Sequence, residues 1–274
     1  MKMKTISKVS IYFFLIIVIT FFMLPIIWFS TASIMPGELV FSDPPTIFFE
    51  PVNKAFYEAF LNPGPHLVQL FNSLTITSFA VLVNLPLSFS AAYGLSRGNL
   101  KSAPRILGWY LGLLMAPPIV FLLPYFIMIS NLGLSGTKLS IVVVLQVVTI
   151  PFSIWLLKSF IDEIPFEIEE AAKIDGAGIR AILFQIVIPL CAPGIIVTTM
   201  FAFVFAWNNT VFPLILSDHN SATLQIGLLS YFSASGAIWN LIAAITVVSM
   251  VIPMLIFLVF DRYVVRGLTF GAIK

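Results

Sequence analysis

Six long stretches of the chain contain no charged residue. Each approaches or exceeds the roughly 20 apolar residues that a helix needs to cross about 30 Å of hydrocarbon. Continuous apolar runs, rather than short segments of alternating polarity, favour helices over a membrane β-barrel. The pattern predicts an all-α integral membrane protein with six transmembrane helices. The predicted spans are residues 11–30, 67–95, 106–129, 139–157, 186–212 and 239–260.

The positive charges predict how the spans are oriented in the membrane. Lys and Arg are retained on the cytoplasmic side of a membrane protein. If the N-terminus lies inside, only Lys54 and Lys138 of the 14 Lys and Arg residues fall outside, so we expect an N-in, C-in topology. The alternative is that Lys2, Lys4, Lys8 and the following apolar run form a cleaved signal peptide. That run is longer than the roughly 7 to 15 apolar residues of such a peptide, which disfavours this interpretation.

Composition narrows the class of protein. Hydrophobic residues make up 59% of the chain and charged residues 9%, whereas a soluble domain carries about 25% charge. A net charge of +2 also argues against a disordered chain. One cysteine, Cys191, and two histidines leave no internal disulfide and little for a metal centre, so we expect no metal site and no cofactor in the chain.

The connections between the predicted spans are too short for a separate soluble domain of ordinary size. We therefore predict a single transmembrane domain over residues 1–274, with a cytoplasmic loop at 158–185 and a C-terminal tail at 261–274.

The cytoplasmic loop contains the signals of a short helix. Pro165 suits a first helical position, acidic residues follow it, and Asp175-Gly176 suits a helix end. An apolar face is formed by Ile164, Ile168, Ala171 and Ala172. This face either lies on the lipid headgroups or docks against another protein. Three clustered glutamates disfavour an anionic leaflet.

Glu170-Ala171-Ala172 with Gly176, Ile186 and Pro189 resembles the EAA loop of ABC importer permeases. Further matches resemble the carbohydrate-uptake (maltose-type) branch, and specifically the shorter permease of its pair. They are Asn72-Ser73, Ala91-Ala92-Tyr93 with Arg97, Gly133-Leu134, Trp207-Asn208 and Arg266-Gly267-Leu268-Thr269. One departure is Asn209, which stands where the family often has an acidic residue.

This resemblance implies a type I ABC importer permease fold with a cytoplasmic coupling helix. It implies a second homologous permease, two nucleotide-binding ATPase subunits and an extracytoplasmic solute-binding protein as partners. The chain has no G-x-x-x-x-G-K-[ST] string to hold ATP phosphates, so ATP and Mg are expected on the ATPase subunits. The resemblance places the chain in the cytoplasmic (inner) membrane of a bacterium or archaeon, surrounded by the lipid bilayer, with no nucleic-acid partner.

The resemblance also implies roles for individual residues. The tail residues Arg266, Gly267, Leu268 and Thr269 are candidates for a further ATPase contact, the alternative being a solvated terminus. Gly176 lets the chain turn at the docking surface, or serves only as a helix cap. The predicted ATPase-coupling residues are Pro165, Glu169, Glu170, Ala171, Ala172, Asp175, Gly176, Ala177 and Pro189.

Polar residues within spans are candidates for the translocation path, because polar groups in hydrocarbon need a partner or a water-filled cavity. Each is more often part of an interhelical hydrogen bond. Trp207 offers a sugar an apolar ring face, or is an ordinary interfacial anchor. The candidates are Asn84, Ser88, Gln146, Thr198, Thr199, Trp207 and Asn208. Prolines expected to kink or interrupt the spans are Pro86, Pro117, Pro118, Pro124, Pro189 and Pro193.

Other functions are less consistent with the sequence. A membrane enzyme needs a nucleophile and base at membrane depth, but His66 and His219 lie outside the predicted spans, and no catalytic residues are expected. A self-sufficient channel or secondary transporter usually has ionisable residues within its spans, and these spans have none. The resemblance favours an oligosaccharide, disaccharide or polyol as solute. A non-sugar solute, such as an amino acid, peptide or phosphorylated solute, is the alternative.

Overall fold

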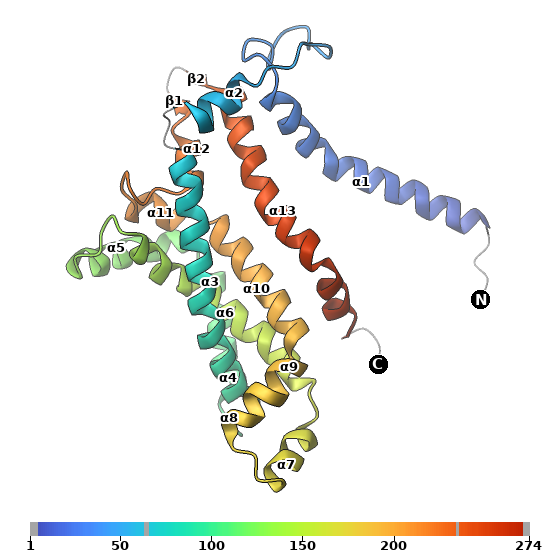
Figure 1. Cartoon of the computed structure of the whole chain (residues 1–274), viewed down its shortest axis with the longest axis vertical. Coiled ribbons are helices and arrows are strands. Elements are labelled where there is room, and N and C mark those ends of the chain that lie inside the picture. The colour runs from blue at the N-terminus through green and yellow to red at the C-terminus, as the bar shows by residue number, and fades with distance from the viewer. Residues whose placement is uncertain (1–4, 63–65, 234–235, 271–274) are drawn as a thin grey trace. The chain divides into compact units, whose positions relative to one another are not determined.

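The computed structural model describes residues 5–62, 66–233 and 236–270 and is built mainly of helices (Figure 1). Its one small sheet pairs β1 with β2 in antiparallel register, with Phe232 opposite Ala237. The elements in chain order are α1 (Thr5–Ser33), α2 (Lys54–Phe56), the π-helix η1 (Tyr57–Leu61), α3 (His66–Arg97), α4 (Ala103–Met115), the 3-10 helix η2 (Pro118–Phe121), α5 (Leu122–Asn131), α6 (Lys138–Asp162), α7 (Phe166–Ile174), α8 (Ile179–Ala181), the π-helix η3 (Ile182–Val187), α9 (Ile188–Leu190), α10 (Ala192–Trp207), α11 (Val211–Leu216), α12 (Leu224–Leu229), β1 (Phe232–Ser233), β2 (Gly236–Ala237) and α13 (Trp239–Phe270).

Within the described residues, four helical segments are individually long and apolar enough to cross a membrane: Ser10–Ser33, His66–Arg97, Lys138–Asp162 and Trp239–Asp261. Two further pairs meet this test only when taken together. Ala103–Met115 and Pro118–Asn131 are bent by 95°, and Ile179–Leu190 and Ala192–Trp207 by 74°. The prediction of a helical membrane protein is confirmed. The count is four spans, or up to six if each bent pair crosses once.

Proline explains the sharper bend. A residue that precedes proline is pushed out of the helical region by the proline ring. Ala116 precedes Pro117, which itself precedes Pro118, and both have extended backbones, with ψ of 131° and 129°. Helix α4 therefore stops at Met115, as the sequence predicts for Pro117 and Pro118. Pro86 differs, because α3 continues through it without ending.

The chain forms two compact units. One comprises residues up to Val68 together with Gly227–Val251, and the other comprises Gln69–Ile226 together with the residues from Ile252 onward. In the first unit, a small core gathers Ala32, Met35 and Val40 around Ala243 of α13. The second unit contains α4 to α11 and the candidate site.

The core of the second unit forms around α6. Eleven of the 25 residues of α6 are buried, among them Ile141, Leu145 and Leu157. Gly194 of α10 packs against Phe160 of α6, where an added Cβ would lie 2.4 Å from Cγ of the Phe160 ring. A larger residue at position 194 would clash with this ring, so glycine permits the close packing of α10 on α6. Helix α6 ends at Asp162, and α7 begins at Phe166.

Candidate functional site

Helix α7 is the short helix that the sequence predicts in the loop 158–185. It lies at one end of its unit, beyond the last turns of α3 and α6 (Figure 1). The helix begins at Phe166, and Pro165 is the preceding cap residue, with φ of −56° and ψ of 129°. The expectation that Pro165 is the first helical residue is therefore off by one position.

The C-terminal end of α7 explains Gly176. Its N–H donates to the carbonyl of Lys173 at 3.0 Å, and the N–H of Ala177 donates to the carbonyl of Ala172 at 2.9 Å. This pair of bonds is a Schellman motif, which requires a left-handed residue after the cap. Gly176 supplies it with φ of +86°, and no atom lies within 4 Å of the position that a Cβ would take. Gly176 is therefore needed for its backbone conformation and not for space.

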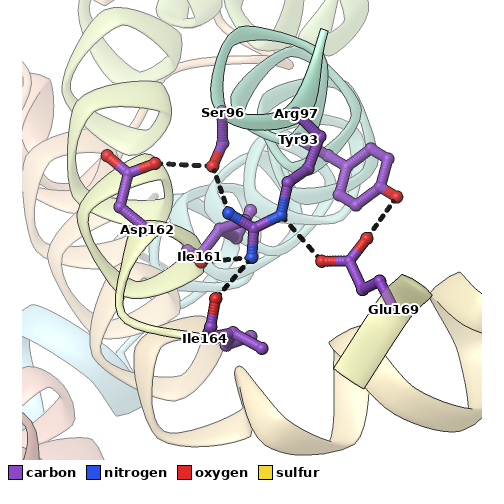
Figure 2. Close-up of polar contacts among 7 residues, drawn as sticks. All are labelled: Tyr93, Ser96, Arg97, Ile161, Asp162, Ile164 and Glu169. Atoms are coloured by element: carbon purple, nitrogen blue, oxygen red, sulfur yellow. Dashed lines mark hydrogen bonds and ion pairs between the residues drawn. The ribbon is translucent and has the colours of Figure 1, made fainter. Parts of the chain in front are cut away.

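The inner face of α7 carries a buried ion pair (Figure 2). Glu169 is fully buried, and its Oε1 accepts a hydrogen bond from Nε of Arg97 at 2.7 Å. Its Oε2 accepts one from the hydroxyl of Tyr93 at 2.8 Å. Arg97 and Tyr93 are one turn apart on α3, so a single face of that helix supplies both donors. Both oxygens of the carboxylate are thus used within the chain.

Arg97 also binds the end of α6. One terminal nitrogen of its guanidinium donates to the carbonyls of Ile161 and Ile164, at 2.9 and 2.7 Å. The last carbonyls of a helix lack intrahelical partners and carry partial negative charge. The guanidinium also lies 5.7 Å from the centre of the Phe166 ring, a cation–π distance. One arginine therefore joins α3, α6 and α7.

A second, more exposed set of bonds flanks this cluster. Ser96 receives a hydrogen bond from Arg97 at 3.2 Å and donates to Asp162 at 2.5 Å (Figure 2). Asp162 also pairs with Lys158, one turn earlier on α6. Exposed pairs of this kind contribute about 0–1 kcal/mol. The buried bonds to Glu169 therefore dominate the connection between α3 and α7.

The opposite face of α7 is left uncovered by the described chain. Ile164 packs into the core and Ala172 lies partly against it, but Ile168 and Ala171 are exposed. Ile174 is 87% exposed. The predicted apolar face is thus divided between an inner part that anchors the helix and an outer part that is open. Glu170 is on the exposed side, in contrast to Glu169.

The remaining coupling candidates lie near this helix or after it. Asp175 is the exposed cap residue of α7, Ala177 is partly buried against the core, and Pro189 lies exposed in α9. The backbone of Arg266, Gly267, Leu268 and Thr269 continues α13. The sequence therefore brings the residues 165–177 together at one helix, while Pro189 belongs to the bent segment that follows it.

The translocation candidates do not form one cluster. Asn84 donates to Thr149 at 3.0 Å and accepts from Ser88 at 3.4 Å, and all three are buried between α3 and α6. The Trp207 ring is buried and stacks on Phe203, with centroids 5.7 Å apart.

The other candidates also have backbone partners. The hydroxyls of Thr198 and Thr199 donate to carbonyls one turn earlier, and the amide of exposed Asn208 donates to Val204. The amide nitrogen of Gln146 donates to Ala80 and Val142, whereas its oxygen has no partner among the described residues.

Two structural features near the predicted residues could not be predicted from the sequence. The first is the role of Tyr93, Arg97 and Phe166 around Glu169; the signal for it is an arginine that ends an apolar span. The second lies at the other end of α3, where Asn72 donates to the carbonyls of Asn220 and Ala222 at 2.9 and 3.0 Å.

Next to Asn72, Ser73 strengthens the same attachment. Its hydroxyl accepts from the N–H of Leu224 at 2.8 Å. These bonds fix the loop that follows α11.

The structure shows no candidate metal site among the residues that it describes. Nowhere in them do three or more His, Cys, Asp or Glu side chains gather so that they could hold a metal ion.

Comparison with known proteins agrees with this geometry. The Escherichia coli protein named inner membrane ABC transporter permease protein YcjP is 29% identical over 274 residues, covering 99% of this chain and 98% of the relative. The trehalose/maltose transport system permease protein MalG of Thermococcus litoralis is 31% identical over 253 residues, 91% of each chain.

The fold has a solved counterpart as well. A chain of a bacterial ABC transporter involved in the import of the acidic polysaccharide alginate superposes with a TM-score of 0.76 at 21% identity, covering 96% of this chain and 99% of that one. The family model described as "Binding-protein-dependent transport system inner membrane component" matches residues 84–270. That range includes the ion pair, α7 and the bent segments, and the chain belongs to this family of inner membrane transport components.

Proposed function

We propose that this chain is the permease subunit of an ATP-driven importer that carries a sugar, and that α7 is its docking helix for a cytoplasmic ATPase subunit. Membership of the family makes the chain a transport subunit and not an enzyme. The observation that carries the proposal is the divided face of α7. Its inner side is bound within the chain, and its outer side is open at Ile168, Ala171 and Ile174.

The outer side of α7 suits a protein partner. Exposed apolar residues at the tip of a unit lose contact with water when a second protein covers them. Ala171 has a small side chain that allows close approach, and Glu170 and Asp175 offer carboxylates to a basic rim. Pro165 and Gly176 set the two ends of the helix, Ala172 and Ala177 support it from the core side, and Pro189 is proposed to position the segment that follows it. The tail residues 266–269 are proposed as a further contact.

The partners follow from this arrangement. A second homologous permease completes the path, two ATPase subunits hold ATP and Mg, and an external binding protein delivers the solute. In this arrangement the chain crosses the inner membrane six times, each bent pair counting as one span, with both termini inside. Names of relatives support a sugar as solute, since one is called a trehalose/maltose permease.

We propose that the seven candidate residues contribute to the solute path in two ways. Asn84, Ser88, Thr198 and Trp207 are buried within this chain and shape the wall. Gln146, Thr199 and Asn208 are less buried as residues, and the amide oxygen of Gln146, which is itself buried, has no partner among the described contacts, so we propose that it becomes accessible when the path opens. An amide oxygen with a free lone pair suits a sugar hydroxyl donor.

The docking proposal is tested by Ala171→Arg in the assembled transporter. The larger, charged side chain would stand between α7 and the ATPase subunit, so the ATPase subunits should be lost during purification through a tag on this chain. Ser102→Arg is the matched control, because Ser102 is exposed on the connection between α3 and α4. Retention of the ATPase subunits by Ala171→Arg would contradict docking at this face.

The solute is tested in proteoliposomes that contain the whole assembly and the binding protein. Maltose and trehalose should stimulate ATP hydrolysis and accumulate inside, whereas methionine should do neither. Stimulation by methionine and not by the sugars would overturn the sugar assignment while leaving the docking proposal intact.

A further inference from the structure

The buried cluster on the inner face of α7 gains a role in transmitting movement if that helix docks a partner protein. We infer that Arg97, Glu169 and Tyr93 form the rigid connection through which movement of α7 reaches α3 and α6. The inference rests on the proposed function, and it makes Glu169 a positioning residue that contacts no partner protein. Its neighbour Glu170 keeps the partner-facing role.

The segments on either side of α7 are turns and not continuous helix. Before it, Glu163 to Pro165 form a turn, with an extended backbone at Pro165. After it, Asp175 to Gly178 form a second turn around the left-handed Gly176. Each turn is a place where a helix can pivot. Side-chain contacts must therefore fix the angle of α7, and the apolar ones come from few residues, chiefly Ile164 and Ala172.

The polar cluster removes this freedom. Both oxygens of Glu169 and all three nitrogens of the Arg97 guanidinium are engaged, at 2.7–3.2 Å. Charge-assisted bonds of this kind are short and directional, so a shift of α7 relative to α3 breaks them. Glu169 is fully buried and the side chain of Arg97 is only 12% exposed, so water has little access to the ion pair as a substitute partner. Any force on α7 is consequently transmitted to α3 and to the end of α6.

An apolar contact would hold α7 less specifically. Burying two charges costs desolvation energy, and well-packed apolar residues of similar size are often equally stable. What the ion pair adds is a defined orientation, because Arg97 meets a carboxylate on α7 and carbonyls at the end of α6 at the same time (Figure 2). This geometry suits a part that must move as one body with its neighbours.

The test is a graded series in the assembled transporter: Tyr93→Phe removes one bond, Glu169→Gln removes the charge, and Glu169→Ala removes both bonds. The measurement is solute transported per ATP hydrolysed in proteoliposomes, together with the amount of ATPase subunit that copurifies. We expect copurification to be unchanged in all three. The transport ratio should fall in that order, reaching about tenfold or more for Glu169→Ala, within the range of coupling between distant sites.

Glu58→Gln is the matched control, because it breaks an exposed pair with Lys54 at 3.8 Å and should leave the ratio unchanged. A wild-type ratio in an intact Glu169→Ala assembly would overturn the inference. If that variant does not assemble, a wild-type ratio in Glu169→Gln overturns it equally. A purely structural role would lower yield and thermal stability without changing the ratio. Failure of the docking proposal appears separately, as retained ATPase subunits in Ala171→Arg.

Discussion

The two ends of α3 each hold a segment that is distant in the sequence, but they do so with different chemistry. At the Arg97 end, a buried ion pair binds Glu169, 72 residues away. At the Asn72 end, a neutral amide binds the carbonyls of Asn220 and Ala222, 148 and 150 residues away. Helix α3 therefore binds α7 through charged side chains and binds the loop after α11 through a neutral side chain.

The difference follows from what each partner offers. A loop presents backbone carbonyls and N–H groups, which a neutral amide and a hydroxyl satisfy without burying charge. Glu169 lies within α7, where the backbone groups are used by the helix itself, so this part of α7 offers side chains and needs a strong side-chain partner to fix its angle. Removing one charge should consequently cost more free energy of unfolding than removing one amide.

The largest effect is expected for Arg97→Ala. It leaves Glu169 buried without its charged partner and removes the guanidinium donor from the carbonyls of Ile161 and Ile164, so we expect a loss of about 3–5 kcal/mol in the free energy of unfolding. Denaturant titration of the purified assembly would measure it. Lys54→Ala, which breaks an exposed pair, should cost about 0–1 kcal/mol. Equal losses in the two variants would show that the buried ion pair stabilises the protein no more than the exposed one does.

Asn72→Ala tests the neutral end. Two carbonyls lose their donor, which should cost about 1–3 kcal/mol. We expect faster proteolytic cleavage between residues 217 and 223 with little change elsewhere. Asn72→Asp should be at least as harmful, because a carboxylate cannot donate to carbonyls. If the loop of Asn72→Ala stays as resistant as that of the wild-type chain, other contacts hold it.

Substitution of Gly176 should cause a smaller loss of stability, which depends on the backbone conformation and not on the size of the new side chain. Because nothing lies within 4 Å of the Cβ position at φ of +86°, Gly176→Ala and Gly176→Leu should lose the same amount, about 1–2 kcal/mol. Gly176→Asn should lose less, since asparagine tolerates this conformation. Hydrogen exchange of the amides of Gly176 and Ala177 measures the opening of the turn. A much larger loss for Leu than for Ala would reveal a packing role that this chain alone does not contain.

The smallest effect is expected in the pH dependence of loop cleavage at the Asn72 end of α3. Asp218 caps the loop, and hydrogen bonds from Ser221 and the N–H of Asn220 hold the pKa of its carboxyl below the ordinary value. A lowered folded pKa means that the stabilisation is complete above the ordinary aspartate pKa and disappears as pH falls through the folded value. Cleavage of the loop should therefore be constant near neutral pH and rise only under acid conditions. Asp218→Asn should abolish this acid dependence.

Much of the architecture was predictable from local sequence. Charge-free runs predicted the apolar helices, and Pro117-Pro118 predicted the 95° bend, because both signals act on neighbouring residues. Sequence similarity confirmed the transport family. The span boundaries and the roles of single residues stay predictions.

The inner side of the site was not predictable in this way. Three glutamates follow one another within four positions of α7, and only the packed structure distinguishes Glu169, which is buried, from Glu167 and Glu170, which are exposed. Nor does the spacing along the chain indicate that Arg97 reaches residue 169, or that Asn72 reaches residue 220. Such contacts depend on how α3, α6 and the loops pack, which no local pattern contains.

The long separation between Arg97 and Glu169 has a consequence for biogenesis. A ribosome makes Arg97 many residues before Glu169, so the guanidinium is unpaired while α3 enters the bilayer. At that stage it acts as a free positive charge, which in the proposed N-in topology holds its end of the helix in the cytosol. Only after α6 and α7 have been synthesised does the same side chain become a structural contact. One arginine therefore first sets the orientation of a nascent helix and later fixes the finished protein.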